Sequence, residues 1–206
     1  MTAEAVLAAA RGELGVTESP AGSNRTKYGA WYGLDGQPWC MMFVQWCFNQ
    51  AGAPALLPVK TASCGALMRA AQAAGQWVTE GYRPGDVAVY DFPGGGATDH
   101  CGIVESVLGG VVTAIEGNTS QSGSQSNGGQ VCRKTRDDAL IVGAFRPEYQ
   151  ETDNIPAPAH KAGVEWCVEK GILTGNAKGD LMLTSPLTRQ QFCTMLYRYH
   201  QRQIHP

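Results

Sequence analysis

Residues 37–52 read QPWCMMFVQWCFNQAG, a turn that opens directly into an apolar helix. Pro38 suits the turn or the first helical position, and no helix breaker follows until Gly52, which is placed to end the helix in a left-handed conformation. Cys40 therefore begins the helix, where free N–H groups and the helix dipole favour a thiolate. Cys47 lies in the middle of the helix and lacks this environment.

Cys40 alone does not establish catalysis, because free cysteines are usually buried and act as small apolar residues. A nucleophilic cysteine also needs a general base, so the histidines decide between the two interpretations. Of the four histidines, three fall in the C-terminal tail. His100 alone begins a predicted strand, directly after the glycine-rich loop at residues 93–99. Without further support, a histidine in such a place is usually an ordinary edge or surface residue.

The composition is that of an ordinary globular protein, with 206 residues, 43% hydrophobic residues and a net charge of −2. No lysine or arginine run suggests a nucleic-acid or anionic-membrane partner. No apolar run approaches the roughly 18 residues of a membrane span, and the N-terminus lacks the basic region of a signal peptide. The seven cysteines show no C-x-x-C spacing, so we expect reduced thiols and no zinc ribbon.

The hydrophobic pattern changes along the chain from helical to strand periodicity, which indicates an α+β fold. Two further helices are predicted in the first half, at residues 2–14 and 62–74. Strands are predicted at residues 87–92, 101–108, 111–115 and 140–145, and residues 119–130 form a polar, mobile loop. A polar, proline-containing linker follows at residues 150–158, and it precedes two helices at residues 159–170 and 189–200, the second opened by a Thr188–Gln191 capping box.

A hairpin at Gly109–Gly110 brings the end of the next strand back beside His100. A plain two-residue turn would place Glu116 and His100 on opposite faces of the sheet, because side chains alternate along a strand. A three-residue loop with a glycine bulge, or an equivalent irregularity, would instead place His100, Glu116 and Asn118 on one face. We therefore predict such an irregularity.

This arrangement gives each residue a role in cysteine catalysis. Cys40 attacks a carbonyl, His100 transfers the proton, and Glu116 or Asn118 orients the imidazole. The Cys40 backbone N–H stabilises the oxyanion, and Gln37 adds a side-chain donor. Substrate contacts are expected from Gln37 and from two aromatic residues on the approach to Cys40, Trp39 and Tyr28. The alternative is that the aromatic residues only cap the core.

Three motifs occur in order: residues 38–47 (PWCMMFVQWC), 99–104 (DHCGIV) and 115–119 (IEGNT). Together they resemble the CHAP family of peptidoglycan amidohydrolases and endopeptidases, over about residues 12 to 147. The resemblance implies a papain-like fold and the same catalytic set. Cys101 stands where the family commonly has valine. Some members of that family bind calcium through clustered acids just before the cysteine. Here Asp35 is the only acid in that stretch, so we expect no calcium site. We also expect no other metal and no cofactor.

The tail resembles one S-layer homology repeat, in residues 164–175 and 186–192. Such repeats bind cell-wall polysaccharides, so Trp166 and Arg189 are candidate wall-binding residues. The alternative is that the repeat only stabilises the enzyme or forms a homo-oligomer. We therefore expect a CHAP-like domain at residues 1–149 and a small helical wall-binding domain at residues 150–206.

The hypothesis for the whole chain is a peptidoglycan hydrolase that cleaves an amide bond. This combination of domains, without a signal peptide, resembles a phage or prophage endolysin, which is held in the host bacterial cytoplasm until it is released to the wall. A bacterial autolysin that uses another export route is the alternative. Its expected partners are peptidoglycan and a secondary wall polysaccharide, without nucleic acid or membrane insertion. Two alternatives remain: a non-catalytic wall-binding module, and a cysteine protease acting on proteins.

Overall fold

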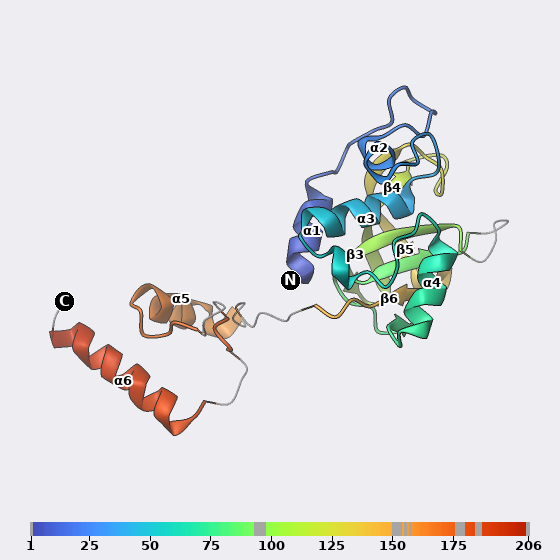
Figure 1. Ribbon diagram of the computed structural model, residues 1–206. Helices are drawn as coiled ribbons and strands as arrows, with labels where there is room; N and C mark the ends of the chain where they lie inside the picture. Colours follow the sequence, from blue (N-terminus) through green and yellow to red (C-terminus); the bar gives the residue numbers. More distant parts are fainter. Residues whose placement is uncertain are drawn as a thin grey trace. The chain divides into compact units, whose positions relative to one another are not determined.

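A computed structural model describes residues 2–92, 98–149, 154, 156, 158–175, 180–183 and 187–204. The chain divides into two compact units, Met1–Tyr149 and Gln150–Pro206. They are joined by the polar segment that begins after Tyr149 (Figure 1). The glycines of the predicted loop at residues 94–96, and most of the predicted linker, lie outside the described residues.

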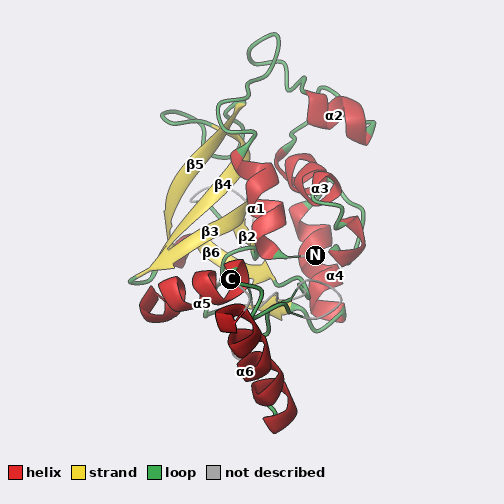
Figure 2. Ribbon diagram, turned by 90° about the vertical axis from the view of Figure 1, so that its left-hand side faces the viewer, coloured by secondary structure: helices red, strands yellow, loops and turns green. Residues whose placement is uncertain are grey.

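Helices in the first unit cover one face of its sheet (Figure 2). α3 is the central one, and it begins and ends where the sequence predicts. Eight of its eleven residues are buried, and Gly52 follows it with a φ of 67°. Thr2 caps α1 by accepting a hydrogen bond from the Ala5 N–H, and Ser63 caps α4 in the same way. The helices are α1 (Ala3–Arg11), α2 (Lys27–Tyr32), α3 (Cys40–Gln50), the 3-10 helix η1 (Pro54–Leu56) and α4 (Cys64–Ala73).

The sheet is antiparallel throughout and has the strand order β1-β6-β2-β3-β4-β5. Four strands form a meander, and the last strand returns to the far side of β2. The strands are β1 (Trp77–Val78), β2 (Val87–Tyr90), β3 (His100–Leu108), β4 (Val111–Thr119), β5 (Gln130–Asp137) and β6 (Ile141–Phe145), with the 3-10 helix η2 (Asp138–Leu140) before β6. This confirms the predicted α+β fold, with helices packed on an antiparallel sheet.

The hairpin between β3 and β4 corrects one prediction and confirms another. Its turn is a plain two-residue turn, because Leu108 pairs with Val111 across Gly109–Gly110, and both glycines have positive φ. The irregularity lies inside β3 instead. The register shifts between Val104 and Ser106, which leaves Glu105 as a bulged residue.

The bulge sets the face on which the polar residues lie. Below it, Ile103 pairs with Ile115, so alternation puts His100, Gly102 and Glu116 on the same face of the sheet. The bulged Glu105 joins the surrounding elements, since its carboxylate accepts hydrogen bonds from Arg11 of α1 (2.7 Å) and from Arg133 of β5. The bulge at Glu105 therefore has the effect predicted for a glycine bulge in the turn, which is to place His100 and Glu116 on one face of the sheet.

The second unit consists of the 3-10 helix η3 (Pro158–His160), α5 (Lys161–Glu169) and α6 (Arg189–Ile204). The predicted capping box is present, with the Thr188 N–H donating to Gln191 Oε1 (2.8 Å) and the Gln191 N–H donating to Thr188 Oγ1 (3.2 Å). Arg198 of α6 donates to the Ile172 carbonyl and to Thr174 Oγ1, both in the segment after α5. None of the helices described is long and apolar enough to cross a membrane.

Candidate active site

Cys40 is the first residue of α3, and its side chain is 6% exposed. No side chain caps this helix end, so backbone N–H groups of its first turn remain free to meet a negative charge. Hydrogen bonds with the Cys101 and Cys64 thiols, and then with His100, hold the pKa of the Cys40 thiol well below its usual range, although burial opposes this. Cys47 differs as predicted, since burial raises the pKa of its thiol.

His100 begins β3 and is fully buried. Burial lowers the pKa of its imidazole, but interactions with Cys40 and Glu116 outweigh burial and raise it to about 9. Nε2 lies 3.0 Å from Glu116 Oε2. Nδ1 is buried and has no hydrogen-bond partner among the described residues, so it is available to the Cys40 thiol, whose interaction with the imidazole raises the pKa of His100. Hydrogen bonds between catalytic groups commonly tighten when substrate binds.

Glu116 contacts His100 and is itself held by Arg136 of β5. Arg136 Nε donates to Oε1 (2.9 Å) and Nη2 to Oε2 (2.6 Å), a bidentate pair at a fully buried carboxylate. Burial raises the pKa of Glu116, yet the hydrogen bonds from Arg136 and His100 bring it below its ordinary value. The guanidinium also stacks over the rings of Tyr90 and Phe92.

Sequence reasoning missed Arg136, because its strand was not predicted. Residues 130–137 read QVCRKTRD, and their charges mask the alternation of a strand. The structure also connects Arg136 to the predicted loop, since Nη1 donates to Gln125 Oε1 (2.9 Å). Lys134 Nζ donates to the Ser120 carbonyl (2.8 Å). The loop after β4 is thus tied to the same strand that holds Glu116.

Gly102 gives the Glu116 side chain the room to reach His100. The two residues occupy opposite positions on β3 and β4, and a Cβ at residue 102 would lie 2.5 Å from Glu116 Cγ. That separation is far below van der Waals contact, so any side chain at this position would displace the carboxylate.

The hydrogen-bond partner of His100 Nε2 is Glu116, whereas the side chain of Asn118 is bonded elsewhere. Its backbone has a φ of 59°, and its Nδ2 donates to the Ser126 carbonyl at 3.4 Å. Its Oδ1 is buried without a hydrogen-bond partner among the described residues. The left-handed backbone at the end of β4 directs the side chain toward the following loop.

The expected substrate contacts of Trp39 and Tyr28 are corrected by their burial. Both are fully buried, and their rings stack at 5.2 Å between centroids. Trp39 Nε1 donates to Glu18 Oε1 (3.2 Å), and Tyr28 OH donates to Glu13 (2.6 Å). They support the start of α3 from inside the core. Gln37 is exposed two residues before that core position.

In the second unit, the predicted wall-binding residues lie on the surface. Trp166 of α5 is 43% exposed, and its ring lies 6.2 Å from that of the similarly exposed Tyr199 of α6. Arg189 begins α6 and is exposed.

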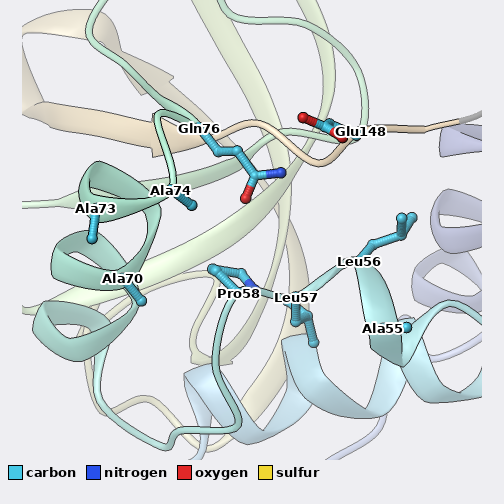
Figure 3. Close-up of a pocket in the computed structure, with 9 residues that line it drawn as sticks. All are labelled: Ala55, Leu56, Leu57, Pro58, Ala70, Ala73, Ala74, Gln76 and Glu148. Atoms are coloured by element: carbon cyan, nitrogen blue, oxygen red, sulfur yellow. The ribbon is translucent and has the colours of Figure 1, made fainter.

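A separate hollow of about 500 Å³ lies between η1 and α4 (Figure 3). None of the residues that line it belongs to the Cys40–His100–Glu116 set. They are Ala55, Leu56, Leu57, Pro58, Ala70, Ala73, Ala74, Gln76 and Glu148.

Comparisons with known proteins found one matching domain family and similar solved structures. Residues 31–118 match the CHAP domain. Among solved structures, the chain is similar to Ly7917 (19% identity, TM-score 0.45, covering 71% of this chain and 63% of that one). It is also similar to Ly7917 with the hydrolyzing product of MDP (18% identity, TM-score 0.44, covering 74% and 67%). The chain thus spans about two thirds of these structures, and no curated protein matches it.

The matched residues begin in α2 and end at Asn118, so they contain Cys40, His100 and Glu116. The motifs around these three residues, in the same order along the chain, are the ones that resemble the CHAP family in the sequence. Residues 31–118, which are less than half of the chain, are thus similar to the CHAP domain.

Proposed function

We propose that this chain is a cysteine hydrolase that cleaves an amide bond of bacterial peptidoglycan. One observation supports the proposal above the others: the Cys40 thiol at the N-terminus of α3 raises the pKa of His100, whose Nε2 lies 3.0 Å from Glu116 Oε2. The CHAP domain match supports peptidoglycan as the substrate.

Each step of the proposed reaction has a residue to carry it. The Cys40 thiolate attacks the amide carbonyl carbon, and the resulting oxyanion is stabilised by the free N–H groups at the start of α3. His100, protonated and held by Glu116, donates its proton to the leaving nitrogen, so the C–N bond breaks and a thioester forms. Water then attacks the thioester while His100 takes a proton, which releases the carboxylic acid and restores the thiolate.

Lysis of cell-wall suspensions tests this proposal. The full chain should clear the suspension, and Cys40→Ala should not. Cys47→Ala is the matched control, because it removes a buried thiol from the same helix outside the catalytic set. Equal clearing by Cys40→Ala would overturn the mechanism. No clearing by any form, with retained wall binding, would favour a non-catalytic wall-binding module.

The bond that is cut can be identified from purified peptidoglycan. Mass spectrometry of the digest shows whether the new amine belongs to L-alanine, as for an amidase, or to a residue within the stem or cross-bridge, as for an endopeptidase. Cleavage of unrelated proteins at a comparable rate, without cleavage of peptidoglycan, would favour a cysteine protease instead.

We also propose that the second unit binds the wall as an S-layer-homology-like repeat. The exposed Trp166–Tyr199 pair supports this, since aromatic faces stack on sugar rings, and the exposed Arg189 can meet anionic wall polymers. The competing proposal is that the exposed apolar side chains of α6 form a homo-oligomer. Sedimentation of the full chain with walls, and its mass in solution, distinguish these two.

We further propose that the chain acts as an endolysin in the cell. Bacteria expressing the chain in the cytoplasm should lyse only after the inner membrane is permeabilised. Lysis without permeabilisation would contradict retention in the cytoplasm.

A further inference from the structure

Three cysteine side chains meet beside His100, although they come from three separate elements. Cys40 begins α3, Cys64 begins α4, and Cys101 is the second residue of β3. Their Sγ atoms all lie within 4.8 Å of one another, and the Cys40–Cys64 pair is 3.9 Å apart. The proposed hydrolysis uses only one of the three thiols. The other two therefore call for a separate account.

The sulfur spacing fits a metal ion better than a disulfide. A disulfide bond has a length of about 2.0 Å, so Cys40 and Cys64 would have to approach by nearly 2 Å. A tetrahedral zinc site has Zn–S distances of about 2.3 Å, which places neighbouring sulfurs about 3.8 Å apart. The observed 3.9 Å nearly equals this tetrahedral edge.

The surroundings also suit a soft metal. Cys40 and Cys64 are each 6% exposed and Cys101 is fully buried, so the cluster is shielded from bulk solvent. Cys40 begins α3, whose free N–H groups stabilise a thiolate, and Cys64 begins α4, where the Ser63 side chain accepts a hydrogen bond from the Ala66 N–H. The Met41 thioether lies 3.8 Å from Cys101 Sγ, and sulfur-rich surroundings select Zn²⁺ or Cu(I) over Mg²⁺ or Ca²⁺.

We propose that Cys40, Cys64 and Cys101 together bind one thiophilic divalent metal ion, expected to be Zn²⁺, and that the bound ion reversibly blocks the nucleophile. Three thiolates supply three tetrahedral positions and water takes the fourth. Thiols that are still protonated release their protons to solvent on binding. The metal then occupies the Cys40 lone pair that would attack the substrate. The proposed metal binding does not depend on the proposed function, whereas the block on hydrolysis rests on it.

Cobalt titration tests the binding site directly. Co²⁺ is added to the full chain under anaerobic conditions with a phosphine reductant, and thiolate-to-cobalt charge transfer is followed by absorption. We expect one equivalent to bind and to be displaced by Zn²⁺. Cys64→Ala and Cys101→Val should each weaken binding at least tenfold. Cys47→Ala is the matched control, because Cys47 is buried on α3 outside the cluster, and it should bind like the wild type.

The activity measurement compares each protein with itself, with and without Zn²⁺. At tenfold excess over its Kd, Zn²⁺ should leave about a tenth of the wild-type rate, and a chelator should restore it. At the same concentration, Cys64→Ala and Cys101→Val should each keep more than half of their own metal-free rate.

The site is overturned if the wild type shows no thiolate-to-cobalt band, or if Cys64→Ala and Cys101→Val leave the band and its affinity unchanged. Should Cys101→Val not fold, as judged by circular dichroism, the Cys64→Ala comparison decides alone. Absence of hydrolysis in the metal-free wild type would overturn the proposed function, while the cobalt result would still decide on the metal site.

Discussion

Replacing Glu116 with glutamine is the most informative perturbation of the catalytic set. The change keeps the size of the side chain but removes the charge that faces His100 Nε2 at 3.0 Å. A glutamine at this position can also turn its NH₂ group toward the ring and favour the wrong tautomer of the imidazole. The variant therefore tests whether Glu116 acts through His100.

The expected magnitude follows from the raised pKa of His100. A rise from the ordinary value of 6.5 to about 9 corresponds to about 3 kcal/mol of stabilisation of the imidazolium, and Glu116 supplies one of the two interactions that produce it. Losing this stabilisation lowers kcat/KM by roughly 10²-fold, and the wrong tautomer can extend the loss toward about 10⁴-fold, as in serine protease triads.

Stability must be measured beside activity, because the same change leaves Arg136 buried without its anion. Breaking a buried ion pair from one side typically destabilises a protein by about 3–5 kcal/mol. Glu105→Gln is the matched control, since Glu105 is paired with two arginines and does not contact His100. Thermal unfolding is followed by circular dichroism, and rates are measured by clearing of wall suspensions at a temperature where every variant is folded.

The expected result is a loss of at least a hundredfold for Glu116→Gln and less than threefold for Glu105→Gln. The alkylation rate of Cys40 by iodoacetamide should also lose the plateau that a thiolate–imidazolium pair gives below the pKa of His100. If folded Glu116→Gln keeps the wild-type rate, or if Glu105→Gln loses as much, the orienting role of Glu116 is refuted.

Three further predictions concern pH, packing and wall binding. Activity should fall as pH rises through about 9, where His100 loses its proton, and a rate that still increases above pH 10 would contradict this. The stability that His100 contributes should be complete below its unfolded pKa of about 6.5 and should be lost as pH rises from about 6.5 to about 9. Gly102→Ala should lower stability by about 1–3 kcal/mol and reduce activity by displacing Glu116, measured by thermal unfolding and wall clearing; wild-type values for both would show that the strands adjust instead. Trp166→Ala should weaken sedimentation with walls while leaving the rate on soluble peptidoglycan fragments unchanged, and equal losses in both assays would argue against a separate wall-binding unit.

The helix at Cys40 could be predicted because its determinants are local. The turn at Pro38, the apolar run and the left-handed Gly52 all lie within sixteen residues, and the structure has the helix at Cys40–Gln50. His100 and Glu116 could be brought together by counting alternation along two strands. The location of the irregularity could not, because a bulge at Glu105 depends on partners in α1 and β5 that are distant in the sequence.

The elements that were missed have weak local signals. α2 has six residues within a turn-rich segment, and β5 carries charges on residues that pair across the sheet. Arg136 therefore became visible only through its contact with Glu116. The cluster of Cys40, Cys64 and Cys101 had no sequence signature for the same reason, since its members are separated by 24 and 37 residues and meet only in the folded chain.

The bulge at Glu105 also determines which changes of length the hairpin can tolerate. Residues added at the Gly109–Gly110 turn extend the tip and leave the pairing of β3 with β4 below it unchanged. Deleting Glu105 removes the register shift, so His100 would turn to the opposite face from Glu116 while the sheet kept its hydrogen bonds. The hairpin should therefore accept added residues at its turn, whereas a single deletion inside the strand would also turn Cys101 and Ile103 away from the core and so cost stability as well as activity.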